Sequence, residues 1–261
     1  LYYLSNGNVL VLSPDANGGG GAITYLDLAG DNIFGEAGFG AVLDVDNSLI
    51  GDSDDPGALG AADIEEFFAG SNHYYAIFNP GFDSDAGAVT FVDANVGIAG
   101  NISAGNSLVG SAGGDMIGLS ANYDFLPNDN IVLLNPQWNG NRGAATFIDL
   151  VGGTGLTGVI DNTNSVVGTT AGDRVGGDGV TSLFGSNTYA VLSPDWSNGG
   201  ATAAGAITWG DIDSGVVGDV GLGNSLVGVN ANDRVGDCCS INFLTSTTWY
   251  VRTQTFDANK S

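Results

Sequence analysis

The sequence predicts an all-β chain of four tandem repeats, each about sixty residues long and four-stranded, with a surplus half-repeat at the C-terminal end. Three short phrases that recur in the same order carry this prediction. An Asn-Ser-Leu-Val-Gly phrase, with Val or Ile variants, begins at Asn47, Asn106, Asn164 and Asn224. A Pro that follows an apolar run stands at Pro14, Pro80, Pro136 and Pro194. A Gly-Ala-x-Thr-aromatic phrase begins at Gly21, Gly87, Gly143 and Gly205. A fixed period with a fixed internal order indicates one supersecondary unit that stacks on copies of itself.

The first long strand of each repeat is the apolar run before the Pro. These runs are residues 9–12, 74–78, 131–134 and 189–192. They are apolar at every position, which is typical of strands that are buried on both faces. We expect each run to end at the Pro, because Pro cannot donate a hydrogen bond to the sheet.

The other elements follow from turn residues. A glycine-rich loop leads to the Gly-Ala-x-Thr strand, whose Thr and aromatic residue favour extended structure. The Asn-Ser phrase predicts a turn that feeds a short strand. An Asp-x-Val-Gly or Asp-x-Ile-Gly turn follows at Asp115, Asp173 and Asp233, and a last strand, residues 180–184 in the third repeat, returns to the next Pro strand. Residues 61–68 leave two alternatives open, one helical turn or a strand with a charged edge.

We predict a single repeat domain over residues 1–261. The repeats are placed approximately at 1–69, 70–126, 127–184 and 185–240, with the surplus half-repeat at 241–261. Four short antiparallel strands in about sixty residues match the size of one propeller blade, so a propeller-like arrangement is favoured. A β-solenoid or stacked-sheet array is the alternative, and a β-sandwich is the third arrangement considered.

Both ends of the chain carry the same half of a repeat. Residues 1–4 precede the first Pro strand, and residues 241–244 and 249–252 repeat that pair of elements. An apolar strand pair without a neighbour is an aggregation liability unless something covers it. Three explanations stay open: a chain cut from a longer array, an irregular cap, or exchange of the terminal strand at Trp249, Tyr250 and Val251 with another copy. Head-to-tail exchange that does not close makes a filament.

Because the chain starts at Leu1 without Met, we interpret it as a mature or truncated product.

The order Asp173-Arg-Val-Gly, then residues 187–194, then Gly205-Ala-Ile-Thr-Trp209 resembles the FG-GAP repeat of integrin-type β-propellers. It is closer still to degenerate forms of that repeat in very large secreted bacterial surface proteins. The resemblance covers nearly the whole chain as a repeat layout. FG-GAP blades often hold a calcium loop between their first two strands. Here that place contains only residues 5–8, 70–72, 127–130 and 185–187, which are too short for the oxygen ligands that calcium needs. The family's metal sites therefore do not carry over.

Charge limits the partners. The chain has 29 Asp and Glu against 5 Lys and Arg, a formal net charge of −24. Such a surface repels nucleic acid and anionic lipid. No apolar run reaches the length of a membrane span, about 18 residues.

The adjacent Cys238 and Cys239 lack zinc spacing and form either a strained disulfide or a pair of buried thiols.

Nothing in the sequence predicts an enzyme. His73 is the single histidine, so no Ser-His-acid arrangement can be argued and a structural role is expected. The neighbouring carboxylates Glu65 and Glu66 are interpreted as solvated. Arg174 and Arg234 occupy one equivalent position in neighbouring repeats, which indicates structural pairing with acidic turns. We expect no cofactor.

Aromatic residues are the better binding candidates. One aromatic position is shared by all four repeats and is expected to pack between adjacent sheets; it holds Tyr25, Phe91, Phe147 and Trp209. Three others stand two residues after a Pro, in predicted loops; they are Phe82, Trp138 and Trp196. Packing is their first interpretation, and contact with another subunit or stacking on sugar rings are the alternatives.

Two further features bear on ligands. The densest acidic cluster comprises Asp44, Asp46, Asp52, Asp54 and Asp55. It is a candidate calcium site, although turn formation and solvation are the default interpretation of such residues. Asn101 begins an Asn-Ile-Ser glycosylation sequon, which has meaning only if the protein is exported through a suitable pathway.

The sequence thus predicts an extracellular or cell-surface, non-enzymatic β-repeat protein built for structure and adhesion. Its expected partner is another copy of itself, in a surface fibre or appendage. The alternative is a glycan-binding propeller lectin that uses the loop aromatics. Nucleic-acid partners and a membrane span are not expected.

Overall fold

The computed structural model describes residues 1–27, 42–53, 59, 62–154, 157–183, 186–237, 240–245 and 248–252. The chain divides into two compact units, Leu1–Ala121 with Leu156–Val159, and Asn122–Gly155 with Ile160–Ser261. Each unit holds two sheets of short strands, and the second unit also holds a hairpin. None of the sheets in the described ranges closes into a barrel. The predicted all-β fold of tandem repeats is confirmed.

The first sheet has the strand order β1-β2-β3-β4-β8. Its strands are β1 (Tyr2–Tyr3), β2 (Val9–Ser13), β3 (Ala22–Leu26), β4 (Leu49–Ile50) and β8 (Gly100–Asn101). The first four come from the first repeat and pair antiparallel. β8 comes from the second repeat and pairs parallel with β4. The sheet is therefore completed by the next repeat along the chain.

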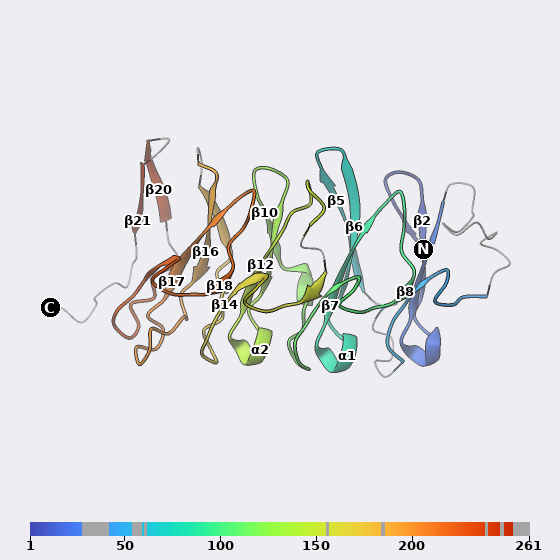
Figure 1. The fold of residues 1–261 in the computed structure, drawn as a ribbon, viewed down its shortest axis with the longest axis horizontal. Coiled ribbons are helices and arrows are strands. Elements are labelled where there is room, and N and C mark those ends of the chain that lie inside the picture. Colours follow the sequence, from blue (N-terminus) through green and yellow to red (C-terminus); the bar gives the residue numbers. More distant parts are fainter. Residues whose placement is uncertain are drawn as a thin grey trace. The chain divides into compact units, whose positions relative to one another are not determined.

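The second sheet has the same plan, in the order β5-β6-β7-β9-β13. Its strands β5, β6 and β7 are labelled in Figure 1. Its strands are β5 (Asp63–Ala69), β6 (Asn72–Asn79), β7 (Ala88–Asp93), β9 (Leu108–Val109) and β13 (Gly158–Val159). β13 is again parallel and is contributed by the third repeat.

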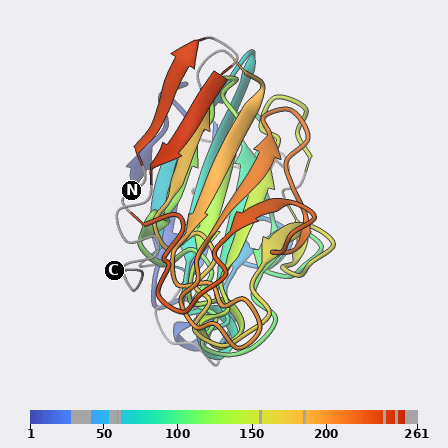
Figure 2. The same cartoon turned by 90° about the vertical axis from the view of Figure 1, so that its left-hand side faces the viewer.

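The second unit repeats this plan. Its first sheet consists of β10 (Tyr123–Phe125), β11 (Ile131–Asn135), β12 (Ala144–Ile148), β14 (Ser165–Val167) and the parallel β18 (Gly218–Asp219). Its second sheet consists of β15 (Val180–Leu183), β16 (Thr188–Ser193), β17 (Ala206–Asp211) and β19 (Ser225–Val227). The hairpin consists of β20 (Ser240–Thr245) and β21 (Thr248–Arg252), drawn in red in Figure 2.

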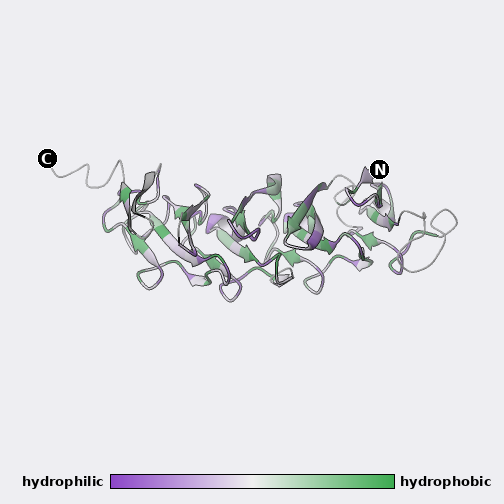
Figure 3. Ribbon diagram, turned by 90° about the horizontal axis from the view of Figure 1, so that it is seen from above, coloured by the Kyte–Doolittle hydropathy of each residue, from purple (hydrophilic) through white to green (hydrophobic). Residues whose placement is uncertain are grey.

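The core of each unit lies between its stacked sheets. In the first unit, Leu10 and Tyr25 belong to the same apolar cluster as Tyr75 and Ile77 of the next sheet. All four are at most 2% exposed. Hydrophobic segments accordingly recur along the strands in Figure 3. The runs before Pro80, Pro136 and Pro194 are apolar at every position because most residues of their strands β6, β11 and β16 are buried, whereas β2 is mostly half-buried.

Several local predictions can now be compared with the structure. The central strands β2, β6, β11 and β16 each end at the residue before a Pro, as expected. Residues 63–69 form β5, so the strand alternative is correct for this segment and the helical turn is wrong. Short helical turns interrupt the predicted loops; they are η1 (Asn17–Gly19), α1 (Phe82–Asp85), η3 (Leu119–Ala121) and α2 (Trp138–Asn141). They contain left-handed residues such as Asp83 and Asn139, so they have no helical periodicity that the sequence could reveal.

The surplus half-repeat forms the predicted strand pair. β20 and β21 pair antiparallel, from Ser240 opposite Arg252 to Thr245 opposite Thr248. Val251 packs against an apolar cluster of the preceding sheet that contains Ala190, Leu192 and Ile207. The hairpin thus lies against a sheet of its own chain.

Candidate functional site

The most distinctive site in the molecule is the seam where one repeat adds a strand to the sheet of another. At the first seam, the N–H of Gly100 donates to the carbonyl of Ser48 at 3.0 Å, and the N–H of Ile102 donates to the carbonyl of Ile50 at 3.1 Å. The side chain of Ile102 is 6% exposed and joins the core cluster of the first unit. The added segment therefore supplies two backbone donors and one apolar anchor. We call this segment the donor and the strand that receives it the acceptor.

The other two seams follow the same pattern. Gly158 donates its N–H to the carbonyl of Ser107 at 3.0 Å, and Val220 donates to the carbonyl of Val167, also at 3.0 Å. The anchor positions that correspond to Ile102 hold Ile160 and Val220, which are 0% and 5% exposed. Strand addition supplies main-chain hydrogen bonds with little dependence on side chains, and the anchor provides the specificity.

The Asn of the Asn-Ser phrase fixes the loop that follows each donor. Its side-chain oxygen accepts a backbone N–H three residues earlier, at 2.9–3.1 Å in all four repeats. Its side-chain nitrogen donates to the carbonyl five residues earlier in three of them, Asn47 to Val42, Asn106 to Asn101 and Asn224 to Asp219. In these three repeats the Asn side chain therefore fixes the backbone of the residue five positions before it. In the second and fourth repeats that residue is the last one of a donor strand, Asn101 or Asp219, and in the first repeat it is Val42.

The Ser of the same phrase and the Thr of the Gly-Ala-x-Thr phrase form a rung between adjacent strands. Their hydroxyls lie 2.6–2.8 Å apart in the four pairs Thr24–Ser48, Thr90–Ser107, Thr146–Ser165 and Thr208–Ser225. Each Ser hydroxyl also donates to the neighbouring Asn side chain at 2.8–3.0 Å. The two phrases recur together because this pair of hydroxyls joins each acceptor strand to the Gly-Ala-x-Thr strand beside it in the sheet.

One acceptor differs from the rest. In the described part of the chain, β19 has β17 as its only neighbour in the sheet. Leu226 at its centre is 46% exposed, whereas the equivalent Leu49, Leu108 and Val166 are at most 1% exposed. β4, β9 and β14 are buried at every residue. The difference is what removal of a donor strand would produce.

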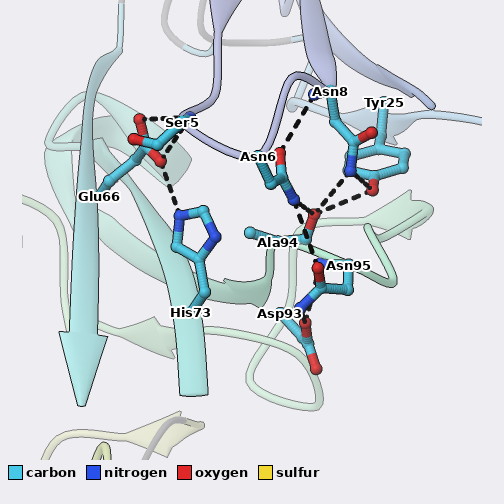
Figure 4. A network of polar contacts seen from close by, with 9 residues as sticks. All are labelled: Ser5, Asn6, Asn8, Tyr25, Glu66, His73, Asp93, Ala94 and Asn95. Carbon is cyan, nitrogen blue, oxygen red and sulfur yellow. Dashed lines mark hydrogen bonds and ion pairs between the residues drawn. The ribbon is translucent and has the colours of Figure 1, made fainter. Parts of the chain in front are cut away.

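A second link between repeats joins asparagine side chains of one repeat to a backbone carbonyl of the next. The side-chain nitrogens of Asn6 and Asn8 donate to the carbonyl of Ala94 in the second repeat, at 2.7 and 3.1 Å (Figure 4). The hydroxyl of Tyr25 donates to the same carbonyl at 2.9 Å and also accepts from Asn8. Burial, with Asp27 and Asp93 nearby, raises the pKa of this tyrosine, so it stays a neutral donor. In the second unit, Asn128 and Asn130 bind the carbonyl of Ile212 at 2.7 and 3.1 Å.

Glu66 lies beside this link (Figure 4). Its carboxylate accepts the backbone N–H of Ser5 at 2.9 Å and contacts Nε2 of His73 at 2.6 Å. Burial raises the pKa of Glu66, but the hydrogen bonds from Ser5 and His73 outweigh it and leave the pKa lowered. The histidine ring also stacks on Phe68, with ring centroids 4.4 Å apart. This arrangement fits the structural role expected for His73, since it joins the first repeat to the second.

The structure places the predicted loop aromatics mostly inside. Trp138 and Trp196 are 6% and 5% exposed, and Trp196 joins a core cluster of the second unit. Their burial agrees with packing, the first interpretation of these residues, and leaves little ring surface for a sugar. Phe82 is partly exposed at the start of α1. The shared aromatic position also packs: Tyr25 is 2% exposed, and Phe147 stacks on Tyr189 with centroids 6.5 Å apart.

The remaining candidates are spread out. Asp44 and Asp46 lie in the turn before β4, and Asp52 follows β4. Asp54, Asp55, Cys238 and Cys239 lie outside the described residues. Among the residues that are described, no three His, Cys, Asp or Glu side chains gather as metal ligands. Tyr250 is 45% exposed on β21, beside Val251, and of Trp249 only the strand position is described.

The two equivalent arginines pair with acidic residues as expected. Arg234 contacts Asp195 at 2.8 Å and Asp237 at 2.7 Å, and Arg174 lies 3.9 Å from Asp195. Asp195 thus connects the turns that follow the third and fourth Asn-Ser phrases. These contacts are at least a quarter exposed, so they add little to stability.

A pocket of about 430 Å³ opens at the first seam. It is lined by Asn17, Ile50, Gly51, Asp52, Ser53, Phe82, Asn101 and Ile102. It brings together three residues that the sequence selected for separate reasons, Phe82, Asp52 and Asn101. An aromatic ring beside amide, hydroxyl and carboxylate groups is a combination that can hold a polar ring compound.

Comparison with known proteins identifies the repeat. A family model described as a repeat of unknown function matches four segments of the chain, residues 3–57, 71–119, 125–177 and 184–237. No curated protein matches the chain. In the described ranges, no helix is long and apolar enough to cross a membrane. The four matches cover most of the sequence, and the chain belongs to the family Repeat of unknown function (DUF5650).

Proposed function

We propose that this chain is an extracellular, non-enzymatic structural and adhesive protein that associates with copies of itself into a surface fibre or appendage. The observation that carries the proposal is the seam. Three sheets are completed by a strand from the following repeat, and the acceptor of the fourth has an open edge in the described residues. A head-to-tail contact of this kind extends without closing.

The chemistry of the seam suits a structural role. Its bonds come from backbone groups and from a Thr-Ser-Asn rung that is present in all four repeats. Repeats of this type contact mainly their neighbours, so stability accumulates along the array. The net charge of −24 keeps such an array soluble and disfavours nucleic acid.

We also propose that the repeat is a degenerate FG-GAP type. Its motif order supports this assignment, and the position of the calcium loop is occupied by asparagines that donate to the next repeat instead. On this proposal, an amide-to-carbonyl link does the joining that a metal loop does elsewhere, and no cofactor is required.

Electron microscopy tests the proposed assembly directly. Purified chain, stained and imaged over a range of concentrations, should give long particles whose length grows with concentration. A second sample that lacks residues 241–261 tests the exchange of the terminal strand, because loss of long particles there would assign the joint to the hairpin. A full-length sample that stays a single chain at every concentration, by imaging and by sedimentation, would exclude the proposal.

A second candidate function is glycan binding in the seam pocket, which the convergence of Phe82, Asp52 and Asn101 favours. We expect the full chain to be retained on at least one sugar of a glycan array, and Phe82→Ala to lose that retention. Phe125→Ala is the matched control, because Phe125 is an aromatic residue 56% exposed on another strand. Circular dichroism would verify that both variants fold. Retention on no sugar, or equal loss in both variants, would rule the pocket out.

A further inference from the structure

We propose that the Val42–Leu43 segment of one copy adds as a parallel fifth strand to β19 of a second copy. This inference rests on the proposed function and names its joint. Three seams within the chain show what an acceptor strand binds. In the described residues, the donor-like segment at Val42 and the acceptor strand β19 have no such partner.

The acceptor side is β19. Its Ser225 and Val227 correspond to Ser48 and Ile50, whose carbonyls receive the donor N–H groups at the first seam. Leu226 is 46% exposed and Val229, just beyond the strand, is 65% exposed. Apolar side chains at an open sheet edge favour the addition of a further strand. Thr208 and Ser225 already form the rung that sets this strand in place.

The donor side is the segment before Asn47. Val42 stands five residues before its Asn, as do Asn101, Val159 and Asp219 in the three working donors. The carbonyl of Val42 is held by Asn47 at 2.8 Å, as that of Asn101 is held by Asn106 at 2.9 Å. Val42 is 81% exposed, and no strand partner of Val42 occurs among the described residues. The segment thus keeps the local bonding of a donor without its acceptor.

Leu43 provides the anchor. It stands where the working donors have Ile102, Ile160 and Val220, which are at most 6% exposed. Leu43 is only partly buried. By analogy with the first seam, its N–H would donate to the carbonyl of Val227, and Val42 would lie opposite Val227. Addition would cover Leu43 and Leu226 together.

The hairpin does not occupy this edge. Val251 packs against a cluster that contains Ala190, Leu192 and Ile207 of β16 and β17, whereas β20 and β21 pair only with each other in the described residues. A longer stretch of sequence precedes this donor than the others. Residues 27–41 lie between β3 and Val42, whereas the later donors follow β7, β12 and β17 after residues 94–99, 149–157 and 212–217.

Two complementary variants test the joint. Leu43→Asp disables the donor and Leu226→Asp disables the acceptor, since a carboxylate cannot be buried at the anchor. By sedimentation velocity, each variant alone should lose the long assemblies of the native chain. Their equimolar mixture should form discrete dimers, because only one donor and one acceptor remain competent. Val96→Asp is the matched control: Val96 is 58% exposed and belongs neither to the Val42–Leu43 segment nor to β19, and this variant should assemble normally.

The outcomes separate the inference from the proposed function. If the native chain assembles and both variants assemble equally well, the joint is wrong while self-association stands. If the native chain never assembles, the proposed function fails. The joint is then tested alone with a synthetic peptide of residues 40–48, added to isotope-labelled Leu43→Asp protein. Shifts of the amide signals of residues 225–229, absent with a Leu43→Asp peptide, support it, and unshifted signals overturn it.

Discussion

At the scale of single residues, the Asp-x-Val-Gly phrase is explained by a buried carboxylate that is hydrogen-bonded. Asp173 is a clear example, with no exposed surface. Its carboxylate accepts the backbone N–H groups of Thr169 and Thr170 at 3.0 and 2.8 Å, and that of Ser197 at 2.9 Å. A buried carboxylate is tolerated only when it is bonded in this way. The Asp-x-Val-Gly phrase is therefore a structural turn.

Substitution of Asp173 by Ala should leave those three N–H groups without their acceptor. We expect a loss of about 2–4 kcal/mol in the free energy of unfolding, because each buried donor without a partner is costly. Asp178→Ala is the control, since Asp178 is exposed five residues away. Urea unfolding monitored by tryptophan fluorescence measures both variants. Equal midpoints for the two would contradict the assigned role.

Glu66 makes stability depend on pH. Its lowered pKa means that folding favours the carboxylate. The stabilisation is thus complete above the ordinary pKa of 4.5 and disappears as pH falls through the lower folded-state value. Glu66→Gln should be less stable than the native chain at pH 7, and the difference should shrink toward pH 3. Thermal unfolding at several pH values checks this. Asp63→Asn, at the exposed start of β5, should show no such convergence.

At the scale of elements, the sequence predicted what its phrases encode directly. Each Pro marked a strand end, and the shared aromatic marked a packed strand. It missed the donor strands, because two residues are too few to show an alternating pattern. Gly100 and Asn101 look like loop residues, and only their neighbour in space makes them a strand. It placed Trp138 and Trp196 in loops and gave packing as their first interpretation, which agrees with their burial.

The Gly of the Gly-Ala-x-Thr phrase shows why an element needs a particular residue. Gly143 has a φ of +79°, and a Cβ there would lie 2.2 Å from the backbone nitrogen of Val175. Gly172 has a φ of +93° with nothing within 4 Å of a Cβ. Both Ala substitutions carry the strain of a left-handed residue, about 1–2 kcal/mol. In Gly143→Ala alone, the turn that contains Val175 must also move away from residue 143, just before the start of β12.

We therefore expect Gly143→Ala to destabilise the chain by about 1–3 kcal/mol more than Gly172→Ala, the range typical of overpacking. Urea unfolding of the two variants measures the difference. Because both share the left-handed backbone, the comparison isolates the close approach between the turn and β12. Equal stability would mean that the turn moves without cost and that the phrase is not selected for this contact.

At the scale of the whole molecule, charge and apolar surface oppose each other. The net charge of −24 makes two copies repel, whereas the exposed Leu226 and Val229 favour contact. Repulsion between surface charges reaches about 30 Å at 0.01 M salt and about 10 Å at 0.1 M. Burial of apolar side chains is not weakened by such screening. Association of this chain should therefore strengthen as salt is added.

Sedimentation velocity at a fixed protein concentration, from 0.01 to 0.3 M NaCl, measures this trend. The mean assembly size of the native chain should rise with salt and level off once the Debye length falls below about 10 Å. The Leu43→Asp variant should stay small across the range, since screening cannot restore its anchor. A decrease of assembly with salt would mean instead that opposite charges hold the copies together. Arg174 and Arg234, which pair with acidic residues, would then become the first residues to examine.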